Sequence, residues 1–267
     1  MLKFCSLVSG SSGNSYVFSN GKARFLVDAG LSGKQIEQRL EQIKVDPRSL
    51  SGIFLTHEHG DHVKGVGVLS RRYNIPLYAN KETWKGMGDR IGKIEGTNQR
   101  YFVTGETVDH FSTGVRSFKT SHDARESVGF TIENSYGKIS IATDTGNMSE
   151  EIYKELEGSN LVIIEANHDV EVLKSGRYPY HLKRRILSDL GHLSNESAGE
   201  CIVRLAKGGV RNFVLAHLSE ENNFPELALT TVNEMVEKHC KEIKEEIFID
   251  IAFRDRISRV YELNKGL

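Results

Sequence analysis

The chain of 267 residues has few cysteines, which could cross-link a small fold, and few prolines, which are common in linkers between domains. Its three cysteines, Cys5, Cys201 and Cys240, are odd in number and far apart, which argues against a disulfide framework and against a zinc site built on cysteine. With only four prolines and no Gly/Ser or Ser/Pro tract, it shows no linker. We therefore expect a single domain over residues 1–267, in the reducing cytoplasm.

Long apolar runs and an excess of one charge are also missing. No apolar run approaches the roughly 20 residues that a membrane-spanning helix requires, and the first residues do not resemble a signal peptide, so we expect no membrane association. Lysine and arginine number 35 and aspartate and glutamate 36, a net charge of −1. The global positive charge of many nucleic-acid-binding proteins is therefore absent, and any contacts with phosphate would have to be local.

What the sequence does contain is a cluster of imidazoles. Residues 57–62 read His-Glu-His-Gly-Asp-His, directly after a short apolar run that we expect to be a strand. Alternation along a strand would point His57 and His59 the same way, and Asp61 and His62 could turn back from the loop and helix that follow. A histidine-rich surface loop is the ordinary alternative. The spacing after a buried strand favours a metal site, because imidazole and carboxylate suit a hydrolytic divalent ion.

Further potential ligands follow short apolar or alternating segments later in the chain. They are His122, Asp144 and His217, and each stands where a strand would release it into a loop at the sheet edge. Each alone would be an ordinary loop residue. In this order, and together with residues 57–62, they resemble the signature of the metallo-β-lactamase superfamily.

This resemblance implies an α/β (α+β) fold, the metallo-β-lactamase αββα sandwich of two mixed sheets flanked by helices, with two divalent metal ions at one sheet edge. It assigns the ligands as two sets and a bridge: His57, His59 and His122 for one ion, Asp61, His62 and His217 for the other, and Asp144 between both. Two ions that share a bridging hydroxide imply a hydrolase with in-line attack. Ligation by nitrogen and oxygen suits zinc, manganese and iron alike.

The sequence also contains one internal echo. Residues 24–30 form a strand-like segment that ends in Asp28 before a helix capped by Ser32, and residues 139–146 end in Asp144 before another serine-capped helix. Two similar half-sandwiches facing each other would produce such an echo. On this interpretation Asp28 orients a ligand imidazole or the loop that carries it. An aspartate that only forms a turn is an equally good interpretation.

Several residues outside the ligand set are candidates for binding substrate. Ser12 and Asn14 lie in a Gly/Ser-rich turn that could cradle an anion, although a tight solvated turn would look the same. His168 follows an apolar strand, and we expect it near the site but not bound to metal. Arg184 and Arg185 lie in a basic segment that either binds phosphate or, as is usual for an amphipathic helix, faces water.

His192, Leu193 and Ser194 sharpen the resemblance. Phosphodiesterase branches of the superfamily carry a His-x-Thr/Ser motif at the start of a helix, where the histidine is thought to protonate the leaving oxygen, and the positive end of the helix would favour phosphate. Asp61 would orient the attacking hydroxide or accept its proton. The β-CASP insertion of related nucleases has no room in this chain.

Within the superfamily, the chain resembles the YycJ/WalJ subfamily of stand-alone nucleases. The segments that carry this resemblance are residues 9–15, 56–62, 165–169, 178–195 and His217. This resemblance implies a 5′-to-3′ exonuclease acting on double-stranded DNA, with a place in DNA mismatch repair. Two other classes stay open: a small-molecule ester, thioester or lactone hydrolase with the same ligands, and a non-catalytic metal-dependent protein that binds DNA or serves as a scaffold. The sequence does not decide the oligomeric state.

Apolar periodicity predicts the secondary structure that carries these residues. Strands are expected at 3–8, 15–19, 24–27, 161–164, 213–216 and 247–253, with hairpin turns at 20–21 and 135–137. Helices are expected from 33 to about 44 and near 149–156, 195–206 and 225–239. One continuous helix is expected to follow the histidine cluster and to reach Tyr73.

Overall fold

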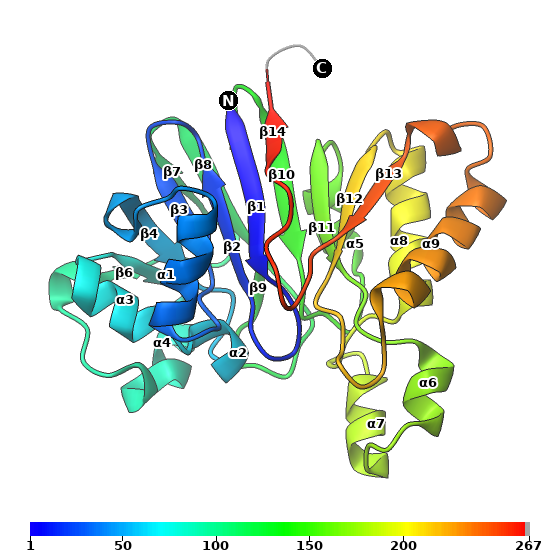
Figure 1. Ribbon diagram of the computed structural model, residues 1–267, viewed down its shortest axis with the longest axis horizontal. Helices are drawn as coiled ribbons and strands as arrows, with labels where there is room; N and C mark the ends of the chain where they lie inside the picture. The colour runs from blue at the N-terminus through cyan, green and yellow to red at the C-terminus, as the bar shows by residue number, and fades with distance from the viewer. Residues whose placement is uncertain (265–267) are drawn as a thin grey trace.

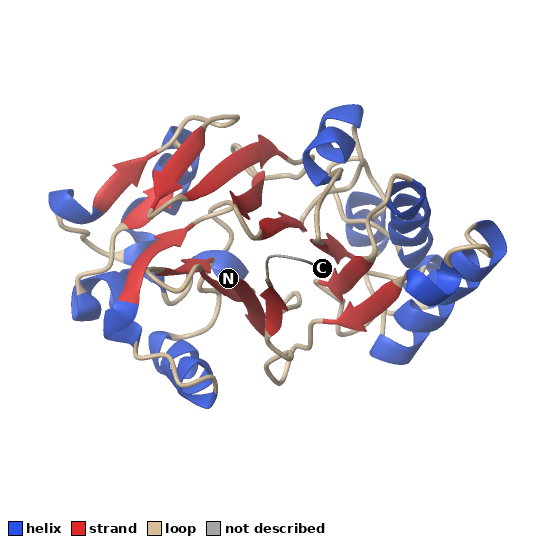
Figure 2. Ribbon diagram, turned by 90° about the horizontal axis from the view of Figure 1, so that it is seen from above, coloured by secondary structure: helices blue, strands red, loops and turns tan. Residues whose placement is uncertain are grey.

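The computed structural model describes residues 1–264, and in it two seven-stranded sheets face each other (Figures 1 and 2). The strands of the first sheet, in spatial order, are β14 (Tyr261–Leu263), β1 (Leu2–Val8), β2 (Ser15–Ser19), β3 (Arg24–Val27), β4 (Leu50–Phe54), β5 (Leu77–Ala79) and β6 (Gln99–Tyr101). The strands of the second are β13 (Phe248–Ile251), β12 (Asn212–Ala216), β11 (Leu161–Glu165), β10 (Gly137–Ala142), β9 (Val128–Asn134), β8 (Thr113–Lys119) and β7 (Thr107–His110).

Helices cover the outer face of each sheet, which gives the predicted αββα layering (Figure 2). The helices are α1 (Gly33–Gln42), α2 (Gly60–Val63), α3 (Val66–Tyr73), α4 (Lys81–Met87), α5 (Glu150–Leu156), α6 (Val170–Ser175), α7 (Tyr180–Ile186), α8 (Asn195–Lys207) and α9 (Pro225–His239). Helices α1, α3 and α4 pack on the first sheet, and α5, α8 and α9 pack on the second. No helix within residues 1–264 is long and apolar enough to cross a membrane.

Both sheets have the same pattern of strand pairing. In the first, β14, β1, β2 and β3 pair antiparallel, and β3, β4, β5 and β6 pair parallel. In the second, β7, β8, β9 and β10 pair antiparallel, and β10, β11, β12 and β13 pair parallel. Strands β3 and β10 therefore occupy equivalent places, which supports the two half-sandwiches that the echo between Asp28 and Asp144 predicted.

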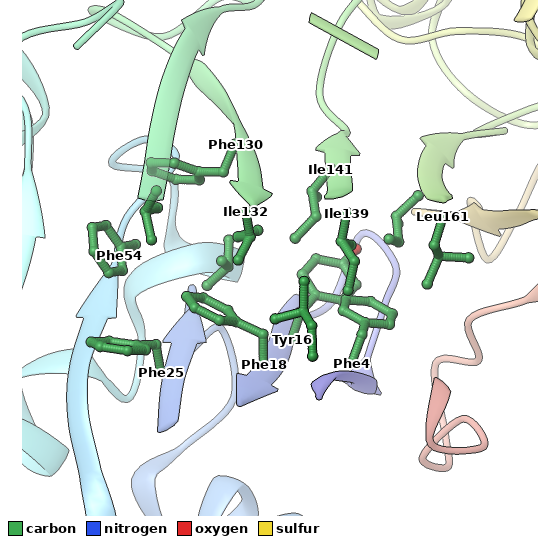
Figure 3. Close-up of a cluster of buried hydrophobic side chains, with 14 of the residues drawn as sticks. Phe4, Tyr16, Phe18, Phe25, Phe54, Phe130, Ile132, Ile139, Ile141 and Leu161 are labelled. Carbon is green, nitrogen blue, oxygen red and sulfur yellow. The ribbon is translucent and has the colours of Figure 1, made fainter. Parts of the chain in front are cut away.

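The core between the sheets follows from alternation along the strands. Phe4, Tyr16, Phe18 and Phe25 point inward from β1, β2 and β3 and meet the second sheet (Figure 3). The residues between them, such as Leu26, point outward toward the helices. Burying one such aromatic side chain contributes about 1.5–3 kcal/mol, so this layer holds the two sheets at a fixed distance.

The predicted strands 15–19 and 24–27 and the predicted helix 225–239 coincide with β2, β3 and α9. The other predicted strands, the helices near 149–156 and 195–206 and the turn at 135–137 are also present, with ends shifted by a few residues. One strand argument was wrong. Strand β4 ends at Phe54, so His57 and His59 lie in the loop beyond it, and His59 is the residue that precedes α2.

The continuous helix predicted after the histidine cluster was also wrong, because α2 and α3 are separated at Gly65. The backbone groups that would continue the helix bond to other loops instead. Asn14 N donates to the carbonyl oxygen of Asp61, Ala29 N donates to that of His62, and Gly65 N donates to that of Ala29, each at 2.8 Å. These bonds fix the histidine loop to the start of β2 and the end of β3.

Candidate metal centre

The candidate site lies where loops leave the carboxyl ends of strands from both sheets. Asp28 and His57 follow β3 and β4, and His122, Asp144 and His217 follow β8, β10 and β12. The short helix α2 lies at this end of the sandwich, at the bottom of the view in Figure 1, where α6 and α7 also lie. Because the sheets face each other, the predicted ligand residues, which are far apart in the sequence, meet at one edge.

Three residues at this edge have left-handed backbone conformations. Asp28 has a φ of 60°, Asp144 of 54° and His217 of 55°. For a residue with a side chain this conformation is strained by about 1–3 kcal/mol and persists only where the surrounding structure enforces it. Here it turns the chain sharply after β3, β10 and β12, so that each side chain lies over the sheet edge.

Buried oxygen atoms hold the imidazoles of the histidine loop in one orientation. The Asp28 carboxylate accepts hydrogen bonds from Nδ1 of His62 at 2.8 Å and from the Thr56 hydroxyl at 2.8 Å. Since that hydroxyl donates to Asp28, its oxygen accepts from Nδ1 of His57, at 3.0 Å. Asp28 itself is fully buried. The Nε2 atoms of His57 and His62 are thereby left to face the site.

The second sheet orients its histidines in the same way. Oε1 of Glu165 accepts hydrogen bonds from Nδ1 of His192 at 2.7 Å and from Nδ1 of His217 at 2.8 Å. The carbonyl oxygen of Gly191 accepts from Nδ1 of His122 at 3.1 Å. Each of these rings therefore has its Nδ1 occupied and its Nε2 available, which is the arrangement that metal-binding histidines commonly have.

Sequence analysis did not assign Glu165 a role, although it is fully buried and holds two imidazoles. Burial alone would raise the pKa of Glu165, but His192 and His217 lower it to about 2. A signal was present in the sequence. Four apolar residues of a parallel strand lead directly into this carboxylate, and a buried carboxylate requires a charged or hydrogen-bonding partner.

Several buried ligand-type atoms in the centre have no hydrogen-bond partner among the described residues: Nε2 of His57, Nε2 of His217 and Oδ2 of Asp144. Leaving a buried polar atom unpaired costs about 1–3 kcal/mol, so such atoms in one place call for a ligand. A divalent cation fits, because imidazole nitrogen and carboxylate oxygen are both among its usual ligands.

The ligand atoms fall into groups whose members all lie within 4.8 Å of one another: His57, His59 and His122; Asp61, His62 and His217; and His57, His62 and Asp144. The first two groups coincide with the two predicted ligand sets. The third joins them, because Asp144 lies beside one histidine from each set. A fourth group contains Asp144, Glu165, His192 and His217, but there Glu165 is already hydrogen-bonded to both imidazoles.

Opposite charges balance one another across this buried centre. Burial would lower the pKa of His62, but the carboxylates of Asp144, Asp61 and Asp28 raise it well above its ordinary value. Burial would raise the pKa of Asp144, but His217 and His62 hold it well below its ordinary value. Burial lowers the pKa of His57, which keeps its imidazole in the neutral form that a cation requires.

Two more of the predicted residues adjoin the centre. The amide nitrogen of Asn14 lies 3.1 Å from Nε2 of His62 and 3.4 Å from Oδ2 of Asp61. The ring of His192 lies 4.9 Å from that of His122, between centroids, and its side chain is 20% exposed. His192 is thus at the rim, where a substrate could reach it.

The remaining predicted residues are further from the ligand atoms or enclosed. Ser12 is exposed on its loop, and Arg184 is exposed on α7. His168 is 1% exposed, and burial lowers its pKa to about 4. Ser194 caps α8 by accepting a hydrogen bond from the backbone nitrogen three residues later. Arg185 forms an ion pair with the residue that follows His122.

Comparison with known proteins gives consistent results. Residues 23–218 match the family model described as "Beta-lactamase superfamily domain". The chain is 42% identical to exodeoxyribonuclease YycJ of Bacillus anthracis over 237 residues, 89% of this chain and 90% of that protein. It is 43% identical to exodeoxyribonuclease WalJ of Streptococcus pneumoniae over 238 residues, 88% of each. The fold resembles that of the metallo-β-lactamase-fold protein YhfI from Bacillus subtilis, with a TM-score of 0.72, 16% identity, and coverage of 96% and 98% of the two chains.

Replacing Glu165 with glutamine tests whether this carboxylate orients the imidazoles of His192 and His217 for metal binding. We expect Glu165→Gln to lower the affinity for divalent metal by about 10–100-fold, because the two imidazoles lose their charged hydrogen-bond acceptor. Competition with a chromophoric chelator measures this affinity. Glu133→Gln, an exposed residue of β9, is the matched control. Wild-type affinity in a folded Glu165→Gln protein would contradict the assignment.

Proposed function

Because this chain belongs to the β-lactamase superfamily, and within it to the group of the YycJ and WalJ proteins, we propose that this metal-dependent hydrolase is an exonuclease that degrades double-stranded DNA from 5′ to 3′. The observation that carries the proposal is the pair of ligand sets joined by Asp144, with His192 at their rim. The names of the two relatives support DNA as the substrate. A role in mismatch repair in the cytoplasm completes the proposal.

The ligand sets would hold two divalent ions, His57, His59 and His122 one and Asp61, His62 and His217 the other, with Asp144 between them. Such ions, when bound, polarise a phosphoryl oxygen and lower the pKa of water. The protein provides a preformed site for them, because Asp28 and Glu165 fix the imidazoles before any ion arrives. Preformed ligands do not have to reorganise during the reaction.

Asp61 is the group best placed to orient the attacking water and to accept its proton. Its side chain is 25% exposed, whereas those of His62 and Asp144 are buried, so Asp61 is the carboxylate of the centre that faces the opening. Burial would raise the pKa of Asp61, but His62 and His217 hold it below its ordinary value. The carboxylate is therefore ionised and able to accept a proton.

His192 is placed to protonate the leaving oxygen. Its Nδ1 donates to Glu165, which fixes the ring and leaves Nε2 for a substrate at the rim. A histidine whose ring is fixed in this way can serve as a general acid toward a leaving oxygen that reaches its Nε2. Ser12, Asn14, His168, Arg184 and Ser194 remain proposed substrate-binding residues around this centre. Arg185, which was predicted with them, is ion-paired with Asp123, and we propose that it positions its helix instead.

A substrate panel tests the reaction class. The manganese-loaded or zinc-loaded protein is incubated with 5′-phosphorylated duplex DNA, single-stranded DNA and RNA, each labelled at the 3′ end, and product lengths are measured. We expect stepwise shortening of the duplex from its 5′ end, and a loss of about 10²–10⁴-fold in rate for Asp61→Ala. Asp109→Ala, an exposed residue of β7, is the control.

Two results would overturn the proposal when a lactone and a glutathione thioester are added to this panel. Hydrolysis of a lactone or glutathione thioester without cleavage of any nucleic acid would indicate a small-molecule hydrolase. Tight binding of DNA without turnover under either ion, with wild type and Asp61→Ala alike, would indicate a non-catalytic protein.

The role of His192 has a test of its own. We expect His192→Ala to slow DNA cleavage by about 10²–10⁴-fold, because the leaving alkoxide needs a proton. The same variant should hydrolyse bis-p-nitrophenyl phosphate nearly as fast as wild type, because p-nitrophenolate leaves without one. Steady-state rates on both substrates measure this split. An equal loss on both would show that His192 does not protonate the leaving group.

A further inference from the structure

The segment that contains α6 and α7 differs in charge from the rest of the chain. Residues 172–188 contain Lys174, Arg177, Lys183, Arg184 and Arg185 and no aspartate or glutamate, whereas the whole chain has a net charge of −1. Two tyrosines and a histidine, at positions 178, 180 and 181, stand among these cations. We call residues 170–191 the arm; it adds one acidic residue at each end of this basic stretch, Glu171 and Asp189. Aromatic and cationic side chains mixed in this way are typical of surfaces that bind nucleic acid.

The arm is attached directly to the metal centre. Its last residue, Gly191, accepts the hydrogen bond from Nδ1 of His122, and Leu190 accepts one from the backbone nitrogen of Asp123 at 3.1 Å. The guanidinium of Arg185 forms an ion pair with Asp123. Figure 1 shows α7 at the same end of the sandwich as α2. A strand lying along the arm would therefore continue into the centre.

The cations of the arm divide into two kinds. Lys183 donates to two backbone carbonyl oxygens at the end of α6, at 2.6 and 2.7 Å, and Arg185 is paired with Asp123, so both hold the arm in place. Lys174 is also engaged, in an ion pair with Glu171 at 2.9 Å. Arg177 and Arg184 are exposed and have no acidic partner among residues 1–264. These two charges are free to meet phosphate.

Tyr180 provides an exposed aromatic surface beside one of these charges. It is 76% exposed, more than any other large hydrophobic side chain in the described part of the chain. Arg184 lies one helical turn further on, with its guanidinium carbon 5.9 Å from the centre of the tyrosine ring. Bases stack on such rings, but the interior of a duplex leaves no base face accessible. The platform therefore fits a terminal or unpaired base.

We propose that the arm binds the end of the DNA substrate, with a terminal or unpaired base stacked on Tyr180 and the adjoining phosphates at Arg184 and Arg177. The inference rests on the proposed exonuclease function and names the part of the substrate that the enzyme recognises beside its metal centre. Charge complementarity selects nucleic acid as the occupant, because the free groups are guanidinium ions and an aromatic ring.

Fluorescence of 2-aminopurine at the 5′ end of a duplex with a short unpaired 5′ end reports the stacking directly. We expect quenching by wild type and by Tyr180→Phe, which keeps the ring, and little quenching by Tyr180→Ala. Kinetics on the same DNA should show KM raised about 5–100-fold by Tyr180→Ala, with kcat within about two-fold of wild type. Arg184→Gln should raise KM. It should also make the slope of log binding constant against log salt concentration smaller by about one, which corresponds to one phosphate contact. Lys238→Gln, an exposed charge on α9, is the control.

The outcomes separate this inference from the proposed function. Normal cleavage by wild type, with the arm variants matching it in quenching and KM, would overturn the inference and leave the nuclease standing. Quenching that depends on Tyr180, without cleavage by wild type, would support the arm as a binding surface and refute the nuclease. Neither quenching nor cleavage would refute both. A lower molar mass of Tyr180→Ala in light scattering, with unchanged DNA binding, would show a contact between copies of the chain and would also overturn the inference.

Discussion

The anchoring of five imidazoles at Nδ1, those of His57, His62, His122, His192 and His217, is the constraint on which the rest of this site depends. Two buried carboxylates, those of Asp28 and Glu165, accept the hydrogen bonds from His62, His192 and His217. Without an acceptor, each ring could rotate or present its other nitrogen. Held as they are, the Nε2 atoms converge on a small volume in which buried donor atoms lack partners. A cation is the ligand that satisfies these atoms together.

The paired sheets make this anchoring possible. Each half-sandwich supplies one strand, β3 or β10, that ends at an aspartate with a left-handed backbone. The two aspartates have different tasks. Asp28 faces His62 and fixes it, whereas Asp144 faces between the two ligand sets and contacts both. The same backbone conformation thus presents an orienting group in one half-sandwich and a candidate bridging ligand in the other. The aromatic layer between the sheets keeps these two aspartates at a constant separation.

The resemblance of the His, Asp and His pattern to the metallo-β-lactamase superfamily was sufficient for the fold class and for the two candidate ligand sets, and apolar periodicity was sufficient for most of the strands and helices. They failed where tertiary hydrogen bonds decide. The break at Gly65 follows from bonds to Ala29 and Asn14, which periodicity does not contain. Glu165 was overlooked because its role depends on two histidines that lie 27 and 52 residues further along the chain. The sequence likewise could not show which cations of the basic segment are free, because the ion pair between Arg185 and Asp123 joins residues far apart in the chain.

The central claim is that two ligand sets, joined by Asp144, each receive one ion. Anomalous diffraction from crystals of the protein grown with manganese tests it most directly. The account predicts two peaks about 3.5–4 Å apart, on the Nε2 side of His57, His62 and His217, with the Asp144 carboxylate between them. A single peak at full occupancy, or peaks on the Nδ1 side of these rings, would contradict it.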